Sequence, residues 1–330
     1  MMKKRGMFVL VLALAAGAAL GWTLDAVAGT TITMKAGIVI DQNHPYYHGI
    51  AKFNEIIGQK TNGRLKVEIY HSSQLGNERD LVEGLSMGSV DLAAVSSAPV
   101  SSFVPKIAVF DLPYLFTSRD QAYKVMDGPI GQGFFKDLEA KSVIGLAYFE
   151  NGFRNITNSK RPINAPADMK GIKIRVMESP VPIATFNTIG ANATPMAWGE
   201  VFTALQQKTI DAQENPMPVI YTQKLFEVQK YLSMTEHFYA PALFLMSKAI
   251  YGKLSPEEQK IVREAAKEAA TYERQVSKQQ AEDFVAKCKE KGMVVNEVNK
   301  KVWQEAMAPV YAKFEGQLGK ELIEAIKNTK

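Results

Sequence analysis

Two hydrophobic periodicities alternate along the chain. Apolar residues occupy every second position in Leu65, Val67 and Ile69, which is the spacing of a β-strand with one buried face. Between residues 50 and 57 they recur every three or four positions, which is the spacing of an amphipathic helix. Because strands keep alternating with helices, the sequence predicts an α/β fold with largely parallel strand pairing. We expect strands at about 31–40, 65–69, 90–95 and 143–149, and helices at about 78–87, 118–127 and 130–140.

This alternation restarts near the middle of the chain. We expect a turn at Asn151-Gly152 and a second structural unit beyond it. An apolar strand at about 239–246 is where we expect the chain to re-enter the first unit. The predicted first lobe comprises residues 29–151 and 241–280, and the predicted second lobe comprises residues 152–240 and 281–330.

A long helix is predicted to begin after Ser255. Ser255 is a capping residue, Pro256 suits the first helical position, and Glu258 completes a capping box. Neither glycine nor proline follows before Gly292, so the helix is expected to run for about 35 residues. It lacks sustained heptads, and a helix of this length could brace two lobes.

One predicted strand carries an arginine. Apolar Ile172, Ile174 and Val176 alternate with Lys173 and Arg175, which is typical of a half-buried strand. We therefore expect Arg175 to point away from the apolar face, toward either water or a ligand.

The N-terminus has the pattern of a secretory signal peptide. Basic residues at 3–5 precede the almost uncharged apolar run 7–20, and residues 26–28 give a small-x-small cleavage site. A membrane anchor is the alternative, but the run is short for a spanning helix. We predict a signal peptide at 1–28 and a mature protein exported to the periplasm.

Charge and cysteine content narrow the class of protein. Lys3, Lys4, Arg5 and Asp25 contribute a net +2 to the formal charge of +5, which leaves +3 beyond residue 28. A charge this small does not argue for nucleic-acid binding. Cys288 is the only cysteine, so no intramolecular disulfide can form, and we expect it to fill core space. An export signal without disulfides fits a Gram-negative periplasm.

Candidate chemistry for catalysis or metal binding is weak. We expect no nucleophile elbow, and no base lies beside Cys288 in the sequence. His44 and His48 are four residues apart, but Pro45 and the loop predicted there disfavour a shared helical face. We expect no enzyme activity, no metal site and no cofactor.

The positive signals are two arginines. A guanidinium binds a carboxylate through two parallel charge-assisted hydrogen bonds, so Arg154 and Arg175 are candidate ligand contacts. Periodicity alone favours a solvated strand residue for each. Taken alone, Trp198 is typical of a core and Asn215 is typical of a turn.

Five segments carry longer motifs in a fixed order. They are 195–206 (Pro-Met-Ala-Trp-Gly-Glu-Val-x-x-Ala-Leu-Gln), 211–216 (Asp-x-Gln-Glu-Asn-Pro), 73–79 (Ser-Gln-Leu-Gly-x-Glu-Arg), 88–91 (Gly-Ser-Val-Asp) and 165–175 (Ala-Pro-Ala-Asp-Met-Lys-Gly-x-Lys-x-Arg). Together they resemble the solute-binding component of tripartite ATP-independent periplasmic (TRAP) transporters, across nearly the whole mature chain. The resemblance implies a periplasmic-binding-protein-like fold, with two α/β lobes, crossing hinge strands and a long lobe-spanning helix.

The resemblance also implies a ligand site. Arg175 is expected to clamp the ligand carboxylate, with Arg154 assisting and Asn215 contacting the same region. Trp198 is expected to stack on the body of the ligand. Further candidate contacts are Glu78, Ser96 and His44. Sialic-acid-binding members carry an acidic residue near the position of Ser96, so sialic acid is not the expected ligand.

The expected function is a periplasmic receptor for a small organic acid. A C4-dicarboxylate, a sugar acid such as a uronate, or another hydroxy or keto acid fits a carboxylate clamp. Lobe closure over the ligand would present it to the integral membrane subunits of a TRAP transporter. A binding module that feeds a sensor kinase is the main alternative, and a periplasmic hydrolase or lyase is a third.

Overall fold

A computed structural model describes residues 30–330 of the chain. The signal peptide predicted at 1–28 lies outside the described residues. None of the helices within 30–330 combines the length and the apolar composition that a bilayer crossing requires.

The described residues build one nine-stranded sheet. Its strand order is β2-β1-β3-β8-β4-β7-β5-β6, and β9 pairs with β8. The strands are β1 (Ile32–Gly37), β2 (Leu65–Tyr70), β3 (Leu92–Ser96), β4 (Val143–Asn158), β5 (Lys173–Val176), β6 (Asn192–Pro195), β7 (Ala212–Pro216), β8 (Tyr231–Ser247) and β9 (Val294–Glu297).

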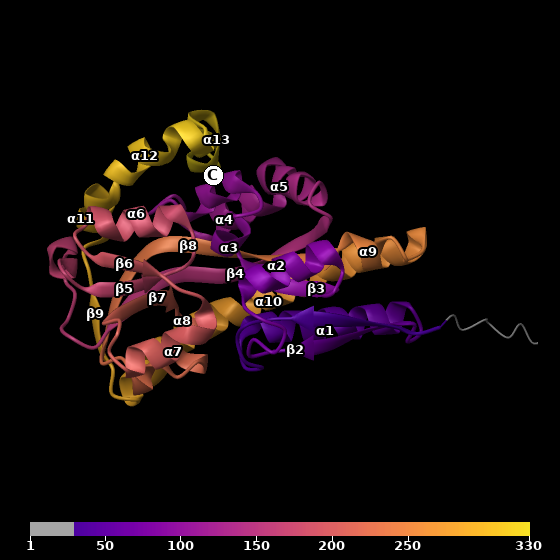
Figure 1. Cartoon of the computed structure of the whole chain (residues 1–330), viewed down its shortest axis with the longest axis horizontal. Helices are drawn as coiled ribbons and strands as arrows, with labels where there is room; N and C mark the ends of the chain where they lie inside the picture. The colour runs from indigo at the N-terminus through magenta and orange to yellow at the C-terminus, as the bar shows by residue number, and fades with distance from the viewer. Residues whose placement is uncertain (1–29) are drawn as a thin grey trace, which may run out of the picture.

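The pairing divides the sheet into two parallel parts joined by an antiparallel centre. β1 pairs parallel with β2 and β3, and β5 pairs parallel with β6 and β7. Between them β4 and β8 run antiparallel to each other and extend from one part into the other. We call the part around β1–β3 lobe I and the part around β5–β7 lobe II; they lie at opposite ends of the molecule in Figure 1. The predicted two-lobed α/β fold with crossing strands is confirmed.

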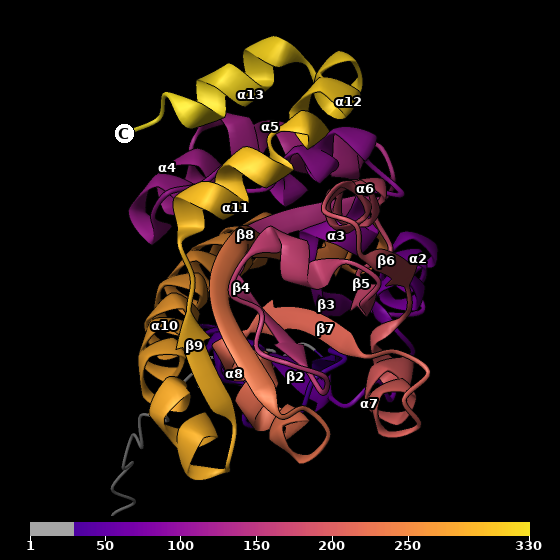
Figure 2. The same ribbon diagram turned by 90° about the vertical axis from the view of Figure 1, so that its left-hand side faces the viewer.

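The turn predicted at Asn151-Gly152 is wrong. β4 is one strand of 16 residues that continues through both positions, and β8 is a strand of 17 residues that accompanies it. The register shifts between Glu150 and Gly152, and Gly152 has a φ of 114°. A β-bulge therefore takes the place of the turn, because a glycine signals either a turn or a bulge. Figure 2 shows the two strands curving side by side through the middle of the molecule.

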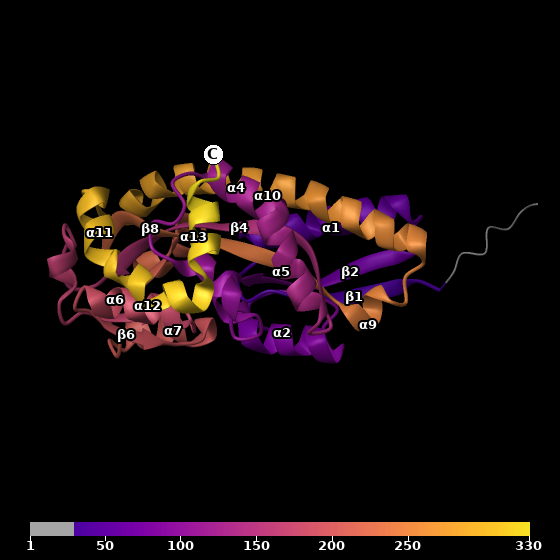
Figure 3. The same cartoon turned by 90° about the horizontal axis from the view of Figure 1, so that it is seen from above.

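Helices cover the sheet and include the predicted long one. They are α1 (Pro45–Lys60), α2 (Glu78–Met87), α3 (Ser97–Val100), α4 (Arg119–Asp127), α5 (Pro129–Glu139), α6 (Pro180–Thr188), α7 (Trp198–Gln206), α8 (Met217–Thr222), α9 (Lys248–Tyr251), α10 (Pro256–Glu290), α11 (Lys300–Met307), α12 (Pro309–Leu318) and α13 (Lys320–Lys327), with 3₁₀ helices η1 (Pro105–Asp111), η2 (Pro166–Met169) and η3 (Leu225–Glu227). α10 has 35 residues and the predicted capping box at Ser255 and Glu258. It packs on α1 of lobe I, on β4 and on α8 of lobe II. Figure 3 shows α10 running along the molecule from above.

The C-terminal helices return to lobe I. α11 and α12 pack on α6 of lobe II, but Ile323 and Ile326 of α13 are buried in the core of lobe I. There Gln121 of α4 donates a hydrogen bond to the carbonyl of Ile326 (3.1 Å). The sequence placed 281–330 in lobe II, so the packing of α13 differs from that expectation. The remaining lobe boundaries stay a prediction.

The strand that carries Arg175 is buried on both faces. Ile174, Arg175 and Val176 are all buried, whereas the sequence predicted a half-buried strand with Arg175 facing either water or a ligand. β5 lies between β6 and β7, and its second face meets the space between the lobes rather than water. The alternation of apolar and polar side chains is therefore present in β5, but Arg175 faces the interior of the molecule.

Candidate ligand-binding site

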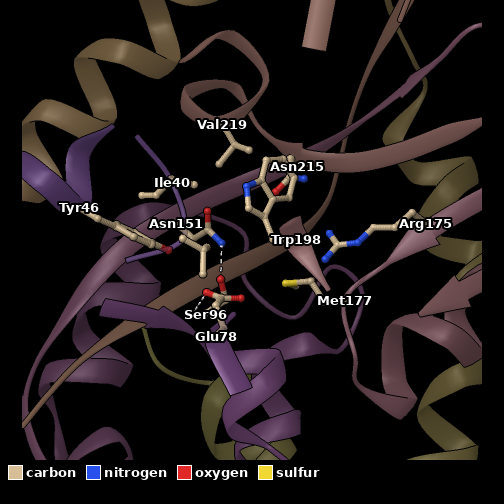
Figure 4. Close-up of a pocket in the computed structure, with 11 residues that line it drawn as sticks. Ile40, Tyr46, Glu78, Ser96, Asn151, Arg175, Met177, Trp198, Asn215 and Val219 are labelled. Atoms are coloured by element: carbon tan, nitrogen blue, oxygen red, sulfur yellow. Dashed lines mark hydrogen bonds between the residues drawn. The ribbon is translucent and has the colours of Figure 1, made fainter. Parts of the chain in front are cut away.

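A pocket lies between the lobes, beside the crossing strand β4. Its cavity volume is small, about 20 Å³, which is room for about one water molecule. Several of its residues lie at or just beyond the carboxyl ends of parallel strands, where open α/β sheets place their ligands. Figure 4 shows the lining side chains, which come from both lobes and from β4. The lining residues are Val39, Ile40, Tyr46, Glu78, Ser96, Asn151, Arg175, Met177, Trp198, Asn215 and Val219.

Arg175 enters the pocket from lobe II. Only 4% of the residue is exposed, and its Nε and Nη2 both donate to the carbonyl oxygen of Met196, at 2.9 and 2.7 Å. No carboxylate within residues 30–330 lies within ion-pair distance of this guanidinium. Its charged centre lies 5.8 Å from the ring of Trp198, within cation–π range. Burial lowers the pKa of Arg175 to about 10, so it stays charged at neutral pH.

Arg154 is fully buried and already has a carboxylate partner. Its Nε and Nη2 bind the two carboxylate oxygens of Glu214, and Nη2 also donates to Asn215 Oδ1 (3.1 Å). Burial alone would raise the pKa of Glu214, but Arg154 and His237 lower it to about 2. Among residues 30–330, Nη1 of Arg154 has no hydrogen-bond partner.

Asn215 connects the pocket wall to a buried polar chain. Its Nδ2 donates to Gln213 Oε1 (2.5 Å), and Gln213 in turn donates to Thr157 Oγ1 (2.7 Å). With Arg154 on its Oδ1, the amide of Asn215 is fixed in orientation from both ends. A rigid amide of this kind can present one fixed hydrogen-bonding pattern to a ligand.

The opposite wall carries acceptors. Glu78, the first residue of α2, accepts a hydrogen bond on Oε1 from the backbone N–H of Ser96 (2.6 Å). Burial raises the pKa of Glu78 above its ordinary value. Asn151 of β4 donates from Nδ2 to Ser96 Oγ (3.1 Å), and its buried Oδ1 has no partner among the described residues. The hydroxyl of buried Tyr46 is likewise without a partner in residues 30–330.

His44 supports this wall from behind. It is the N-cap of α1, and its Nδ1 accepts a hydrogen bond from the backbone N–H of Tyr46 (3.3 Å). The side chain is fully buried, and burial together with His48 lowers its pKa to about 3, so it is neutral at pH 7.

The two lobes touch each other through hydrogen bonds and apolar packing. The backbone N–H of Gly199, next to Trp198, donates to Asn77 Oδ1 at the start of α2 (3.2 Å). Ser179 of lobe II donates to Asp111 of lobe I (2.9 Å). Trp198 packs against the cores of both lobes. The structure is therefore closed over the pocket.

Five of the seven residues expected at a ligand site line this one pocket: Arg175, Asn215, Trp198, Glu78 and Ser96. Arg154 and His44 lie behind the wall, bound to Asn215 and Tyr46. Contact between a ligand and any of the seven remains a prediction.

The sequence did not predict Tyr46, Asn151 and Met177, among other residues of the pocket. A signal for Asn151 was present, since it immediately precedes Gly152 at the junction expected between the lobes, and the structure places it within the bulge of β4.

A serine with nucleophile-elbow spacing lies elsewhere. Residues 84–88 read Gly-Leu-Ser-Met-Gly, which has the Gly-x-Ser-x-Gly spacing although no nucleophile elbow was expected. Ser86 lies in the last turns of α2, and its hydroxyl donates to the carbonyl of Lys141 (2.8 Å). An elbow needs a sharp turn between strand and helix, so the spacing has no such context here.

Two lobes closed over a pocket with charged walls are typical of two-lobed ligand-binding proteins. Comparison with known sequences identifies the family. The family model described as "Bacterial extracellular solute-binding protein, family 7" (DctP) matches residues 36–317. A protein of Verminephrobacter eiseniae named "Solute-binding protein" is 42% identical over 304 residues, which cover 92% of this chain and 91% of that protein. The chain belongs to the DctP family of TRAP solute-binding proteins, as its motifs predicted.

Solved structures give the same result. A TRAP periplasmic solute-binding protein from Bordetella bronchispeptica, with density attributed to pantoate, is 41% identical with a TM-score of 0.89, covering 91% of this chain and all (100%) of that one. Another from Polaromonas sp. JS666, bound to D-erythronate, is 40% identical with a TM-score of 0.89, covering 90% and 99%. Proteins of this family are periplasmic, bind small carboxylates and work with the membrane subunits of TRAP transporters.

Proposed function

We propose that this chain is a periplasmic receptor that captures a small organic acid through Arg175 and passes it to TRAP membrane subunits. The observation that carries the proposal is a buried arginine that faces a pocket and, among residues 30–330, donates only to a carbonyl oxygen. The predicted signal peptide, if cleaved after residue 28, would account for export. We expect capture and release without a catalytic step.

The energetics of Arg175 favour an acidic ligand. A buried charge that has lost its partner destabilises a protein by about 3–5 kcal/mol. A carboxylate bound in the pocket would supply that partner through parallel N–H···O bonds. Because the lobes touch around the pocket, the ligand would bind the closed state more tightly than the open one and shift the population toward closure.

Neighbouring groups suit the same carboxylate. Asn215 lines the pocket with a fixed amide, and we assign it a contact in the carboxylate region. Arg154 has Nη1 without a partner among residues 30–330, which supports its predicted assisting role once the ligand is bound. Trp198 lies over Arg175 and offers an apolar face to the body of the ligand. His44 was also predicted to contact the ligand. Its position behind Tyr46 is the only support for that contact within the described residues.

The class of ligand follows from the relatives as well as from the site. Pantoate and D-erythronate, named for the two solved relatives, are both small carboxylates. We infer a ligand of that kind for this chain, and a C4-dicarboxylate, a sugar acid or a related hydroxy acid all contain the required group.

A thermal-shift screen of ligand-free, refolded protein tests the proposal. The panel pairs each acid (D-erythronate, pantoate, galactonate, glucuronate, succinate) with its uncharged methyl ester. At a concentration of about 100 Kd, a ligand specific for the native state stabilises it by about 2.7 kcal/mol, which for a chain of this size raises Tm by roughly 5 °C. At least one acid should raise Tm and its ester should not. If no acid does so, or if esters act equally, the receptor function proposed here is wrong.

A further inference from the structure

We propose that the pocket selects a monocarboxylate bearing hydroxyl groups over a dicarboxylate, and that Glu78 makes this selection. The inference rests on the proposed function, because it takes the carboxylate of the ligand to bind at Arg175. What it adds is the chemistry of the opposite end of the ligand and the residue that recognises it.

The pocket has opposite charges on its two sides. In Figure 4 the guanidinium of Arg175 reaches in from lobe II, while Glu78 and Ser96 of lobe I lie across from it with Asn151. Arg175 and Glu78 both line the pocket but are not within ion-pair distance of each other, so neither neutralises the other directly. A ligand that spans the pocket would therefore meet a cation at one end and a carboxylate at the other.

Glu78 is held so that it can accept further hydrogen bonds. The backbone N–H of Ser96 donates to Oε1 and fixes the side chain, and the Ser96 hydroxyl adds a second contact to this carboxylate. A carboxylate has two oxygens and can accept about four hydrogen bonds, so it can still accept donors from a ligand. No lysine or arginine within residues 30–330 forms an ion pair with this carboxylate. The Glu78 carboxylate can therefore accept hydrogen bonds from O–H or N–H groups of a ligand.

Asn151 adds a second acceptor on the same side. Its Nδ2 is used by Ser96 Oγ, so the amide presents Oδ1, which is buried and has no partner among residues 30–330. Tyr46, also unpartnered in that part of the chain, can either donate or accept. The remaining lining includes the apolar Ile40, Met177 and Val219, so polar recognition is confined to the two sides.

This pattern discriminates between two kinds of acid. An alcohol at the far end of the ligand can donate its proton to Glu78 and to Asn151. A second carboxylate has no proton to donate at neutral pH, and its charge is repelled by Glu78 in a site sheltered from water. Like charges brought together in an interface cost enough to weaken binding by about 100-fold or more.

A matched pair of ligands tests the proposal by isothermal titration calorimetry of refolded, ligand-free protein. D-Erythronate and meso-tartrate differ only at carbon 4, which is CH₂OH in the first and COO⁻ in the second. Galactonate and galactarate form the equivalent six-carbon pair. We expect the monocarboxylate of at least one pair to bind about 100-fold more tightly than its dicarboxylate.

Variants assign the selection to Glu78. In Glu78→Gln the amide oxygen can still accept from Ser96, and the amide nitrogen turns a donor toward the pocket. The variant should bind the monocarboxylate less tightly and the dicarboxylate more tightly, which reduces the ratio to about tenfold or less. Glu83→Gln, the same change on the same helix at a partly exposed residue paired with Arg79, should leave the ratio unchanged.

The outcomes distinguish failure of the proposed selectivity from failure of the proposed receptor function. Equal or tighter binding of the dicarboxylates by the natural protein would overturn the selectivity while leaving a carboxylate receptor intact. An unchanged ratio in Glu78→Gln would overturn the role of Glu78. Binding of neither acid in either pair, together with a flat thermal-shift screen, would overturn the receptor function itself and this inference with it.

Discussion

Two buried arginines in this protein have different surroundings, and we propose different roles for them. Arg154 has a carboxylate partner in Glu214, whereas Arg175 donates only to the carbonyl of Met196 within the part of the chain that the structure describes. In the sequence both follow strand-like patterns and look alike. The presence or absence of an internal partner, which depends on β7 lying beside β4, is what makes Arg175 the candidate clamp and Arg154 a residue that orients Asn215.

The pair of Arg154 and Glu214 gives a prediction at this scale. Glu214→Gln leaves Arg154 as a buried charge without a counter-charge, so the free energy of unfolding at pH 7 should fall by about 3–5 kcal/mol. Urea denaturation of the ligand-free protein measures it. The double variant Arg154→Met/Glu214→Gln should recover part of the loss, because it removes the unpaired charge.

The same variant has a pH signature of definite sign. The pKa of Glu214 is about 2 in the folded protein, against 4.5 for the ordinary side chain. Its contribution to stability is therefore complete above pH 4.5 and is lost as the pH falls toward 2. The stability difference between natural protein and Glu214→Gln should shrink by about 1.4 kcal/mol per pH unit below 4.5. A difference that stays constant from pH 6 to pH 3 would contradict the assignment.

At the scale of elements, the crossing strands decide the architecture. β4 and β8 each extend through both lobes, and the bulge at Gly152 lets β4 change register without ending. The φ of 114° at Gly152 is a conformation that other residues adopt only with strain. A Cβ there would meet Pro216 at 3.4 Å, which is ordinary contact, so the requirement for glycine is conformational rather than steric.

Gly152→Ala should therefore destabilise the protein through backbone strain alone. We expect a loss of about 1–3 kcal/mol in the free energy of unfolding, measured by urea denaturation. The matched control is Gly133→Ala in α5, where a Cβ meets nothing within 4 Å and the backbone is helical. That control should be neutral or stabilising by up to about 1 kcal/mol. Equal effects of the two substitutions would show that the bulge does not need its glycine.

The sequence predicted the elements that local chemistry defines. Ser255 and Glu258 specify the start of α10, and the alternation in Leu65, Val67 and Ile69 specifies β2. The joining regions were harder to predict because their structure depends on distant partners. Gly152 is compatible with a turn or a bulge until β8 is known to pair there, and α13 shows its lobe only through contacts with α4.

The residues of the candidate site were predicted mainly from the sequence motifs. Hydrophobic periodicity contributed only the prediction that Arg175 lies on a strand. The order of motifs brought Arg175, Trp198 and Asn215 together, and the structure places all three on one pocket. Tyr46 and Asn151 belong to no motif used for the prediction. They join the pocket because the start of α1 and the middle of β4 meet between the lobes, which is a property of the tertiary fold.

At the scale of the whole molecule, the pocket and the closed state depend on each other. Lobe I contributes Glu78, lobe II contributes Arg175, and the bond from Gly199 to Asn77 joins the lobes beside them. Neither lobe contains the complete site. A ligand held by Arg175 and contacted from lobe I would therefore link binding to closure, which is the state that membrane subunits could recognise.

The central claim is that Arg175 supplies the carboxylate contact on which binding depends. Isothermal titration calorimetry of ligand-free protein, with the acid that raises Tm most in the thermal-shift screen, compares the natural protein with Arg175→Ala. Lys173→Ala, an exposed position on the same strand, is the control. Loss of one partner of a buried charge pair costs about 2–5 kcal/mol, so Arg175→Ala should bind at least about 30-fold more weakly and Lys173→Ala should bind normally. An affinity of Arg175→Ala within about threefold of the natural protein would contradict the account.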